Sequence, residues 1–214
     1  MDLFARWVAM ISIVARADET IRLRRRGLRL EYATLGWNVV GSVLVLAAAL
    51  TARSVALAGF GLDSLIEIVA SLVVVWQLQE MQAVERERRA LQIIGIAFLL
   101  LAVYIAGQSI YVLVSEVRPH PSLLGIVWLA LTVVAMFALA AAKQATGRAL
   151  GNRVLQTEAR VTLIDGLLAA AVLTGLMLNA AIGWWWADPA AAFAIVYYGL
   201  REGRHALRET SSSR

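Results

Sequence analysis

The chain has 214 residues, of which 60% are hydrophobic, and its mean hydropathy is +0.72. Soluble domains are only about half apolar, so we expect an integral membrane protein. The absence of cysteine excludes disulfides, thiolate metal sites and thiol redox chemistry. The two histidines, His120 and His205, lie outside the apolar stretches, so a metal site within the membrane has to use oxygen ligands. A net charge of +5 would fit a nucleic-acid binder, but in a membrane protein the placement of charge is more informative than its sum.

Residues 1–30 predict a cytoplasmic segment on the membrane surface. In residues 1–17, apolar side chains recur at helical spacing with Arg6 and Arg16 on the other side, which is typical of an interfacial amphipathic helix. The apolar part is too short to span, and a charge divides it, which disfavours a signal peptide. The basic cluster at residues 22–26 suits anionic lipid headgroups, and a nucleic-acid arm is the alternative.

Six apolar stretches follow, and we expect each to cross the membrane as a helix. The last is the weakest, because its apolar core from Pro189 to Leu200 is short and Arg201 and Arg204 would have to reach the interface. The sequence thus predicts an all-α membrane protein: a six-helix transmembrane bundle over residues 31–207, preceded by the interfacial helix and followed by a short cytoplasmic tail, 208–214. The predicted spans are residues 33–51, 55–78, 91–114, 123–142, 159–182 and 189–207.

The distribution of basic residues predicts the orientation. The N-terminal segment, the connections after the second and fourth spans, and the tail carry 18 of the 20 Lys and Arg residues, whereas the other side has only Arg53 and Arg118. The positive-inside rule then places both termini in the cytoplasm of a multi-pass protein of the inner (plasma) membrane. Two termini on the same side of the membrane require an even number of spans, which supports the sixth predicted span.

Acidic residues interrupt the second and fifth spans. Asp63 and Glu67 are four residues apart and therefore project from one face of a helix, and Asp165 lies near the start of the fifth span. An acidic side chain at membrane depth costs roughly 2.5–3.5 kcal/mol on insertion scales, and neighbouring acids repel each other. Such an arrangement is understandable if a cation neutralises the acidic side chains. The alternative is a structural set that is protonated or bonded to an arginine of a neighbouring helix.

Glu158 lies seven residues before Asp165 and shares its helix face, about two turns towards the cytoplasm. Two interpretations remain open for it. It is either a carboxylate on the entry path of an ion, or an interfacial residue paired with Arg160 or Arg153.

Several short motifs resemble the membrane domain of the cation diffusion facilitator family over about residues 31–207. Residues 54–63 read SVALAGFGLD and lead into Glu67; residues 157–160 read TEAR and lead into Asp165; and residues 186–189, WADP, open the sixth span. Asn38 matches a polar position that often faces the transport site in that family. Each motif is weak alone, but their order and spacing make the resemblance fairly specific.

The resemblance implies six helices, cytoplasmic termini, and Asp63, Glu67 and Asp165 as ligands of a transported divalent metal. The sequence departs from the family pattern in three ways. Val161 occupies the usual fourth ligand position, the loop at residues 79–89 lacks the His and Asp ligands of some members, and the cytoplasmic domain of typical members is missing. Water, Asn38 or Thr162 would complete the coordination.

We therefore expect a secondary transporter, not an enzyme, that exports a divalent metal in exchange for protons. All-oxygen ligation favours Mn²⁺ or Fe²⁺ and leaves Zn²⁺ and Co²⁺ open. We expect no permanently bound cofactor, a homodimer in the lipid bilayer, and no nucleic-acid partner. The alternative is a non-transporting membrane subunit that binds metal or a partner protein and has a regulatory role, which Val161 and the missing domain favour.

Overall fold

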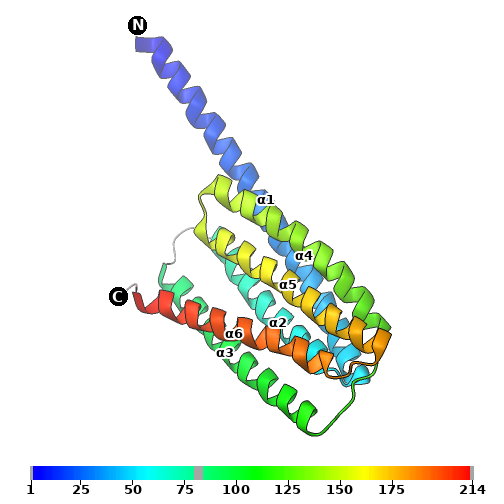
Figure 1. The fold of residues 1–214 in the computed structure, drawn as a ribbon. Coiled ribbons are helices and arrows are strands. Elements are labelled where there is room, and N and C mark those ends of the chain that lie inside the picture. Colours follow the sequence, from blue (N-terminus) through cyan, green and yellow to red (C-terminus); the bar gives the residue numbers. More distant parts are fainter. Residues whose placement is uncertain (1, 80–83, 213–214) are drawn as a thin grey trace.

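The computed structural model describes residues 2–79 and 84–212, and this part of the chain folds into six α-helices (Figure 1). Each predicted span has a helical counterpart. The helices are α1 (Asp2–Ala52), α2 (Val55–Gln79), α3 (Val84–Val114), α4 (Leu123–Leu150), α5 (Arg153–Ile182) and α6 (Ala187–Ser212).

The helix α1 is a single element of 51 residues, about 75 Å long at 1.5 Å per residue. The prediction of a separate N-terminal helix followed by a first span was therefore wrong in one respect, because the helix continues between them. All three prolines of the chain lie after residue 118, and the residues at 18–32 include Leu, Arg and Glu, which favour helix. That residues 2–17 lie at a membrane interface stays a prediction.

The helix α2 lies at the centre of the bundle and packs against α1, α3, α5 and α6. The most extensive packing joins α1 with α2, α4 with α5, and α3 with α6. Buried apolar side chains between the helices include Leu57 and Phe60 of α2, Ile105 of α3, and Ile195 of α6. The N-terminal part of α1 extends beyond the rest of the bundle in Figure 1.

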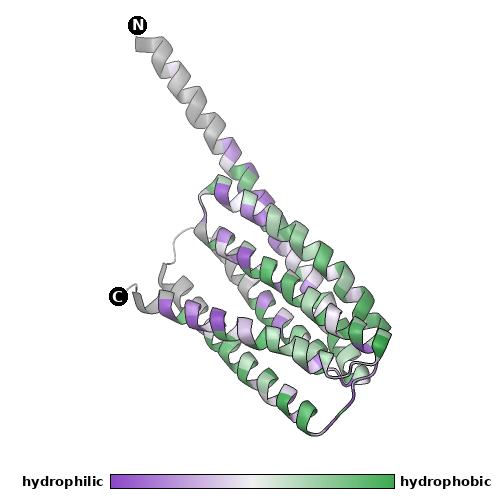
Figure 2. Cartoon of the chain, viewed as in Figure 1, coloured by the Kyte–Doolittle hydropathy of each residue, from purple (hydrophilic) through white to green (hydrophobic). Residues whose placement is uncertain are grey.

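Four segments within the described residues are long and apolar enough to cross a membrane. Many large apolar side chains on the outside of the bundle are exposed, such as Leu50, Val103 and Val134, as expected of helices that face lipid. Figure 2 shows hydrophobic residues along most of the bundle and hydrophilic residues gathered near the α4–α5 connection and the C-terminal part of α6. The four segments are residues 18–52, 95–114, 123–150 and 154–182; α2 and α6 are not among them, so six spans stay a prediction.

Hydrogen bonds between connections hold one end of the bundle together, which we call the α3–α4 end. The His120 amide donates to the Ala52 carbonyl (2.7 Å), and the Asn179 amide side chain donates to the Pro119 carbonyl (2.9 Å). These bonds tie the α3–α4 connection to the last residues of α1 and of α5. The opposite end, which carries the α4–α5 connection, is called the α4–α5 end.

Candidate metal-transport site

Three helices bring polar side chains to one internal track. On α1 these side chains recur every three or four residues, so they share one face, and the same is true of α2 and α5. The track covers about 16 Å of α1 at 1.5 Å per residue. Its members are all buried: Glu31, Thr34, Asn38 and Ser42 of α1, Asp63, Glu67 and Ser71 of α2, and Glu158, Thr162 and Asp165 of α5.

The predicted ligands come together within this track. Asp63, Glu67 and Asp165 are at most 4% exposed, and Asp165 interacts electrostatically with both of the other carboxyl groups. The Glu67 carboxyl group also lies near the Asn38 side chain. We call Asp63, Glu67, Asp165 and Asn38 the inner cluster.

Within the described part of the chain, several buried polar atoms of the inner cluster have no hydrogen-bond partner. They are Glu67 Oε2, both carboxylate oxygens of Asp165, and Asn38 Nδ2. Glu67 is thus close to Asp165 and Asn38 without forming hydrogen bonds of good geometry to them. Among the described residues, no three His, Asp or Glu side chains are already arranged to hold a metal ion. The carboxylates are neighbours, but a bound ion would have to draw them closer.

A second group of side chains lies on the same track, nearer the α4–α5 end. The ammonium group of Lys143 in α4 forms ion pairs with Glu31 Oε2 (3.1 Å) and Glu158 Oε1 (2.5 Å), and it donates a hydrogen bond to Thr162 Oγ1 (3.1 Å). Lys143 and Glu31 are fully buried. We call Glu31, Glu158 and Thr162 the outer cage.

Thr162 connects the two groups. Its hydroxyl oxygen lies 3.0 Å from Glu67 Oε1 of the inner cluster and 3.1 Å from Glu158 Oε1 of the outer cage. Since a hydroxyl has one proton, it donates to one of these carboxylates at a time. The Ser71 hydroxyl also donates to Glu158 Oε1 (3.2 Å). The polar track is therefore continuous from the outer cage to the inner cluster.

The structure corrects the expected pairing of Glu158. Its ion pair is with Lys143 of α4, whereas Arg160 is exposed, and the side chain of Arg153 is outside the described part. Sequence reasoning counted Lys143 as a loop cation, because the apolar run ends at residue 142, and it did not single out Glu31. The available signal was that Lys143 is the only lysine of the chain and follows an uninterrupted apolar stretch.

Two further positions at which the sequence departs from the family pattern are Val161 and the loop at residues 79–89. Val161 is half-buried beside Thr162, and its side chain has no atom that can coordinate a metal. The loop at residues 79–89 lies partly outside the described residues, which omit 80–83.

Charge on the track is unbalanced. Among the side chains that the structure describes, five buried carboxyl groups share it with one buried cation, Lys143, which is also the cation near the inner cluster. Each unpaired ionised group in such surroundings costs several kcal/mol, so protons or a further cation must balance the rest. The five are Glu31, Asp63, Glu67, Glu158 and Asp165.

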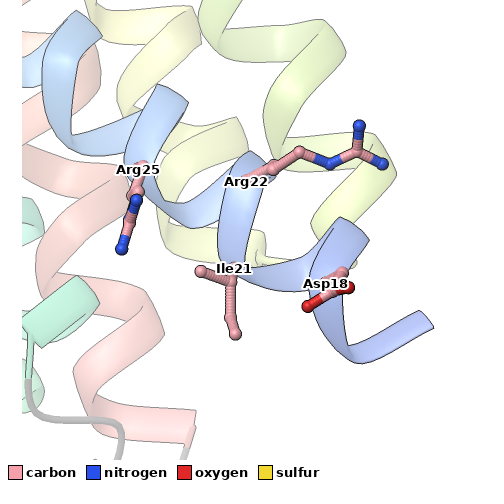
Figure 3. Close-up of a pocket in the computed structure, with 4 residues that line it drawn as sticks. All are labelled: Asp18, Ile21, Arg22 and Arg25. Carbon is pink, nitrogen blue, oxygen red and sulfur yellow. The ribbon is translucent and has the colours of Figure 1, made fainter. Parts of the chain in front are cut away.

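A surface hollow elsewhere does not belong to this site. Figure 3 shows it on α1, lined by Asp18, Ile21, Arg22 and Arg25, whose side chains point in different directions. All four are exposed and come from the part of α1 before Glu31. The hollow therefore adds no ligand to the buried track.

Comparisons with known proteins agree with this architecture. The model of the cation efflux transmembrane domain matches residues 91–213, more than half of the chain, including Glu158 and Asp165 but not Asp63 or Glu67. Transmembrane protein 163 of Xenopus laevis is 25% identical over 163 residues, which cover 74% of this chain. The chain spans 57% of the length of that relative. The matched transmembrane domain and the apolar helices establish a membrane protein, and the chain belongs to the cation efflux family, whose members transport divalent metal cations.

Proposed function

We propose that this protein is a proton-coupled exporter of a divalent metal, with Asp63, Glu67 and Asp165 as the ion-binding carboxylates. The observation that supports this most is the excess of buried carboxyl groups over buried cations on one continuous track. A divalent ion cancels two negative charges, and protons cancel them when the ion has left. Carboxylate oxygens are suitable ligands for a hard or borderline divalent ion.

Competition between the ion and protons provides the coupling. With the ion bound, the carboxylates of the inner cluster are ionised and share the charge of the ion. Without the ion, these carboxyl groups take up protons, because clustered like charges in a low-dielectric interior are costly. Protons that bind from the side of the membrane opposite the cytoplasm release the ion to that side. The protonated cluster then becomes accessible from the cytoplasm again. Helix movements around the site give access from one side at a time.

The other residues of the track support this cycle. Asn38 lies beside Glu67 and offers an amide oxygen, and Thr162 offers a hydroxyl oxygen at 3.0 Å from Glu67 Oε1. Either completes the coordination that Val161 cannot supply. Glu158 lies on the path from the α4–α5 end, which the excess of basic residues assigns to the cytoplasm. Oxygen-only ligation favours Mn²⁺ or Fe²⁺, with Zn²⁺ and Co²⁺ to be compared.

Transport by the purified protein in lipid vesicles tests the proposal. With an imposed pH gradient, wild-type protein should move Mn²⁺, Fe²⁺, Zn²⁺ or Co²⁺ and carry protons the opposite way. Asp63→Asn and Asp165→Asn keep the side-chain shape but remove a charged ligand, so flux should fall by about 10–100-fold or more. Asp18→Asn, at an exposed position, is the matched control. Flux in Asp63→Asn equal to that of wild type would refute the assignment of the site.

A regulatory, non-transporting role is the second candidate. The observation that favours it is that the three carboxyl groups are not already arranged as a metal-binding group in the described part of the chain. A regulator would gain thermal stability from metal, in a manner that depends on Asp63, but would show no flux of any of the four metals in vesicles. Flux that depends on Asp63 excludes this candidate.

A further inference from the structure

Lys143 occupies a site that resembles the binding site of a small cation. An ammonium group has three protons to donate, and each has an oxygen partner here: Glu31 Oε2, Glu158 Oε1 and Thr162 Oγ1. These oxygens come from α1 and α5, whereas the lysine comes from α4. The outer cage is thus a set of oxygen ligands around a positive charge that reaches it from a third helix.

The outer cage has more ligands than its occupant uses. Glu31 Oε1 and Glu158 Oε2 are buried and have no hydrogen-bond partner among the described side chains. Glu31 is fully buried and Glu158 is 3% exposed. Two carboxylates also carry twice the charge of one ammonium group. A divalent cation would balance that charge and would use the two oxygens that the lysine leaves free.

The outer cage also lies on the line that leads to the inner cluster. Glu31 is seven residues before Asn38 on α1, and Glu158 is seven residues before Asp165 on α5, so both steps measure about 10 Å along a helix. Thr162 contacts carboxylates of both groups. An ion that travels along the track from the α4–α5 end must pass the position of the Lys143 ammonium group.

We propose that Glu31, Glu158 and Thr162 form a second divalent-cation site, which Lys143 fills as a tethered substitute ion and which an entering metal ion takes over by displacing it. This inference rests on the proposed transport function, since it assumes that metal ions use the track. Lysine suits the role because its ammonium group is compact and sits on a flexible stem. An arginine would hold the two carboxylates with several fixed hydrogen bonds and would leave less readily.

Chemical labelling of the wild-type protein tests the displacement. Lys143 is the only lysine, so formaldehyde with cyanoborohydride methylates two sites, Lys143 and the N-terminal amine, which mass spectrometry distinguishes. Saturating Mn²⁺ should speed methylation of Lys143 several-fold and leave the N-terminal amine unchanged. If Mn²⁺ raises the melting temperature of the protein but leaves the Lys143 rate unchanged, the proposal is overturned.

The same labelling separates this inference from the proposed inner site. In the double variant Glu67→Gln/Asp165→Asn the outer cage is intact, so Mn²⁺ should still speed methylation of Lys143 even though transport is lost. An effect of Mn²⁺ on Lys143 that disappears in this variant would mean that the ion acts only from the inner cluster, and the second site would be rejected.

Binding affinity gives an independent measure. Lys143→Met keeps most of the side-chain volume but removes the competing charge, so Mn²⁺ should fill the outer cage at a several-fold lower concentration than in wild type in equilibrium dialysis. Lys143→Met/Glu31→Gln lacks a carboxylate ligand of the outer cage and should lose this gain in affinity. Arg148→Met removes an exposed cation from the same helix and should change nothing. An unchanged Mn²⁺ affinity in Lys143→Met contradicts the proposal, and the labelling decides the matter if that variant does not fold.

Discussion

The carboxylate of Asp188 lies in the first turn of α6, yet its hydrogen bonds go to the start of α2. It accepts from the Ser54 hydroxyl (2.5 Å) and from the Ala56 amide (3.3 Å), and the Ser54 oxygen accepts from the Leu57 amide (3.0 Å). Asp188 therefore caps a helix other than its own, because the α1–α2 connection lies beside it.

Asp188→Ala should therefore destabilise the protein without changing its metal ligands. The variant removes a buried charged acceptor that serves a helix N-terminus, and such bonds contribute about 1.5–3 kcal/mol. We expect the free energy of unfolding, measured by denaturant titration in detergent micelles, to fall by about that amount. Asp18→Ala, at an exposed position, should change it little. Equal stability of the two variants would contradict the capping role of Asp188.

At the level of single residues, the sequence predicted the inner cluster better than the outer cage. The spacing of Asp63 and Glu67 and the family resemblance of the Asp165 segment were enough to bring three carboxylates together in the prediction. Lys143 was not recognised, because a lysine at the end of an apolar run is normally a loop or interface residue. Its partner Glu31 is 112 residues away in sequence, and only the packing of α1 against α4 reveals the contact.

Close approaches of backbones decide how the helices pack. A Cβ atom added at Gly175 of α5 would lie 2.8 Å from the Ala187 carbonyl oxygen and 2.8 Å from the Ala191 Cβ of α6. At Gly36 of α1 an added Cβ would meet nothing within 4 Å. Both glycines lie inside helices, so only the first has a packing reason to lack a side chain.

The same substitution at these two glycines should therefore have opposite effects. Gly175→Ala forces α5 and α6 apart and should cost about 1–3 kcal/mol of stability. Gly36→Ala meets no atom and improves helix propensity, so it should gain about 0.5–1 kcal/mol. Thermal unfolding in micelles, followed by circular dichroism, measures both. A gain in stability for Gly175→Ala would show that α5 and α6 are not in contact at this position.

The apolar runs predicted the helices well but not all of their ends. The α4 helix continues eight residues beyond the predicted end at residue 142, as far as Leu150, and ends at Gly151, which has a positive φ of 63°. The α5 helix begins at Arg153, six residues before its predicted start. Polar residues such as Lys143 and Glu158 lie in these extensions. Hydropathy marks the part of a helix that faces lipid, whereas the helix itself ends where the backbone is broken or capped.

At the scale of the whole molecule, six membrane-spanning helices would place the start of the first span and the end of the last on the same side of the membrane. In Figure 1 the C-terminus and the extended part of α1 lie towards the same end of the bundle, the α4–α5 end. The connection between α3 and α4, which includes Arg118, lies at the other end. Six spans remain a prediction from the sequence, and four segments of the described chain reach the length and hydropathy expected of a span.

Single cysteines test this topology directly, because the natural sequence contains none. Arg118→Cys and Ser212→Cys should react with a membrane-impermeant maleimide from opposite sides of the membrane, and the positive-inside rule predicts that residue 212 reacts only from the cytoplasmic side. Thr20→Cys, in the extended part of α1, should behave like Ser212→Cys. Labelling of residues 118 and 212 from the same side would contradict three spans between them, and labelling of residues 20 and 212 from opposite sides would rule out an even total number of spans.

The two ends of the bundle differ in what must change before an ion can pass. At the α3–α4 end, hydrogen bonds of the His120 amide, the Asn179 side chain and the Asp188 carboxylate tie the α1–α2 and α3–α4 connections to α1, α5 and α6. Opening there requires whole helices to separate and peptide groups to lose their partners together. Towards the α4–α5 end, the obstacle on the track is the single side chain of Lys143, which can leave the track by rotation about the bonds of its own flexible stem. If the protein exports metal as proposed, loading from that end is a local event and release through the other end is a collective and slower one, so the outward step should set the turnover rate.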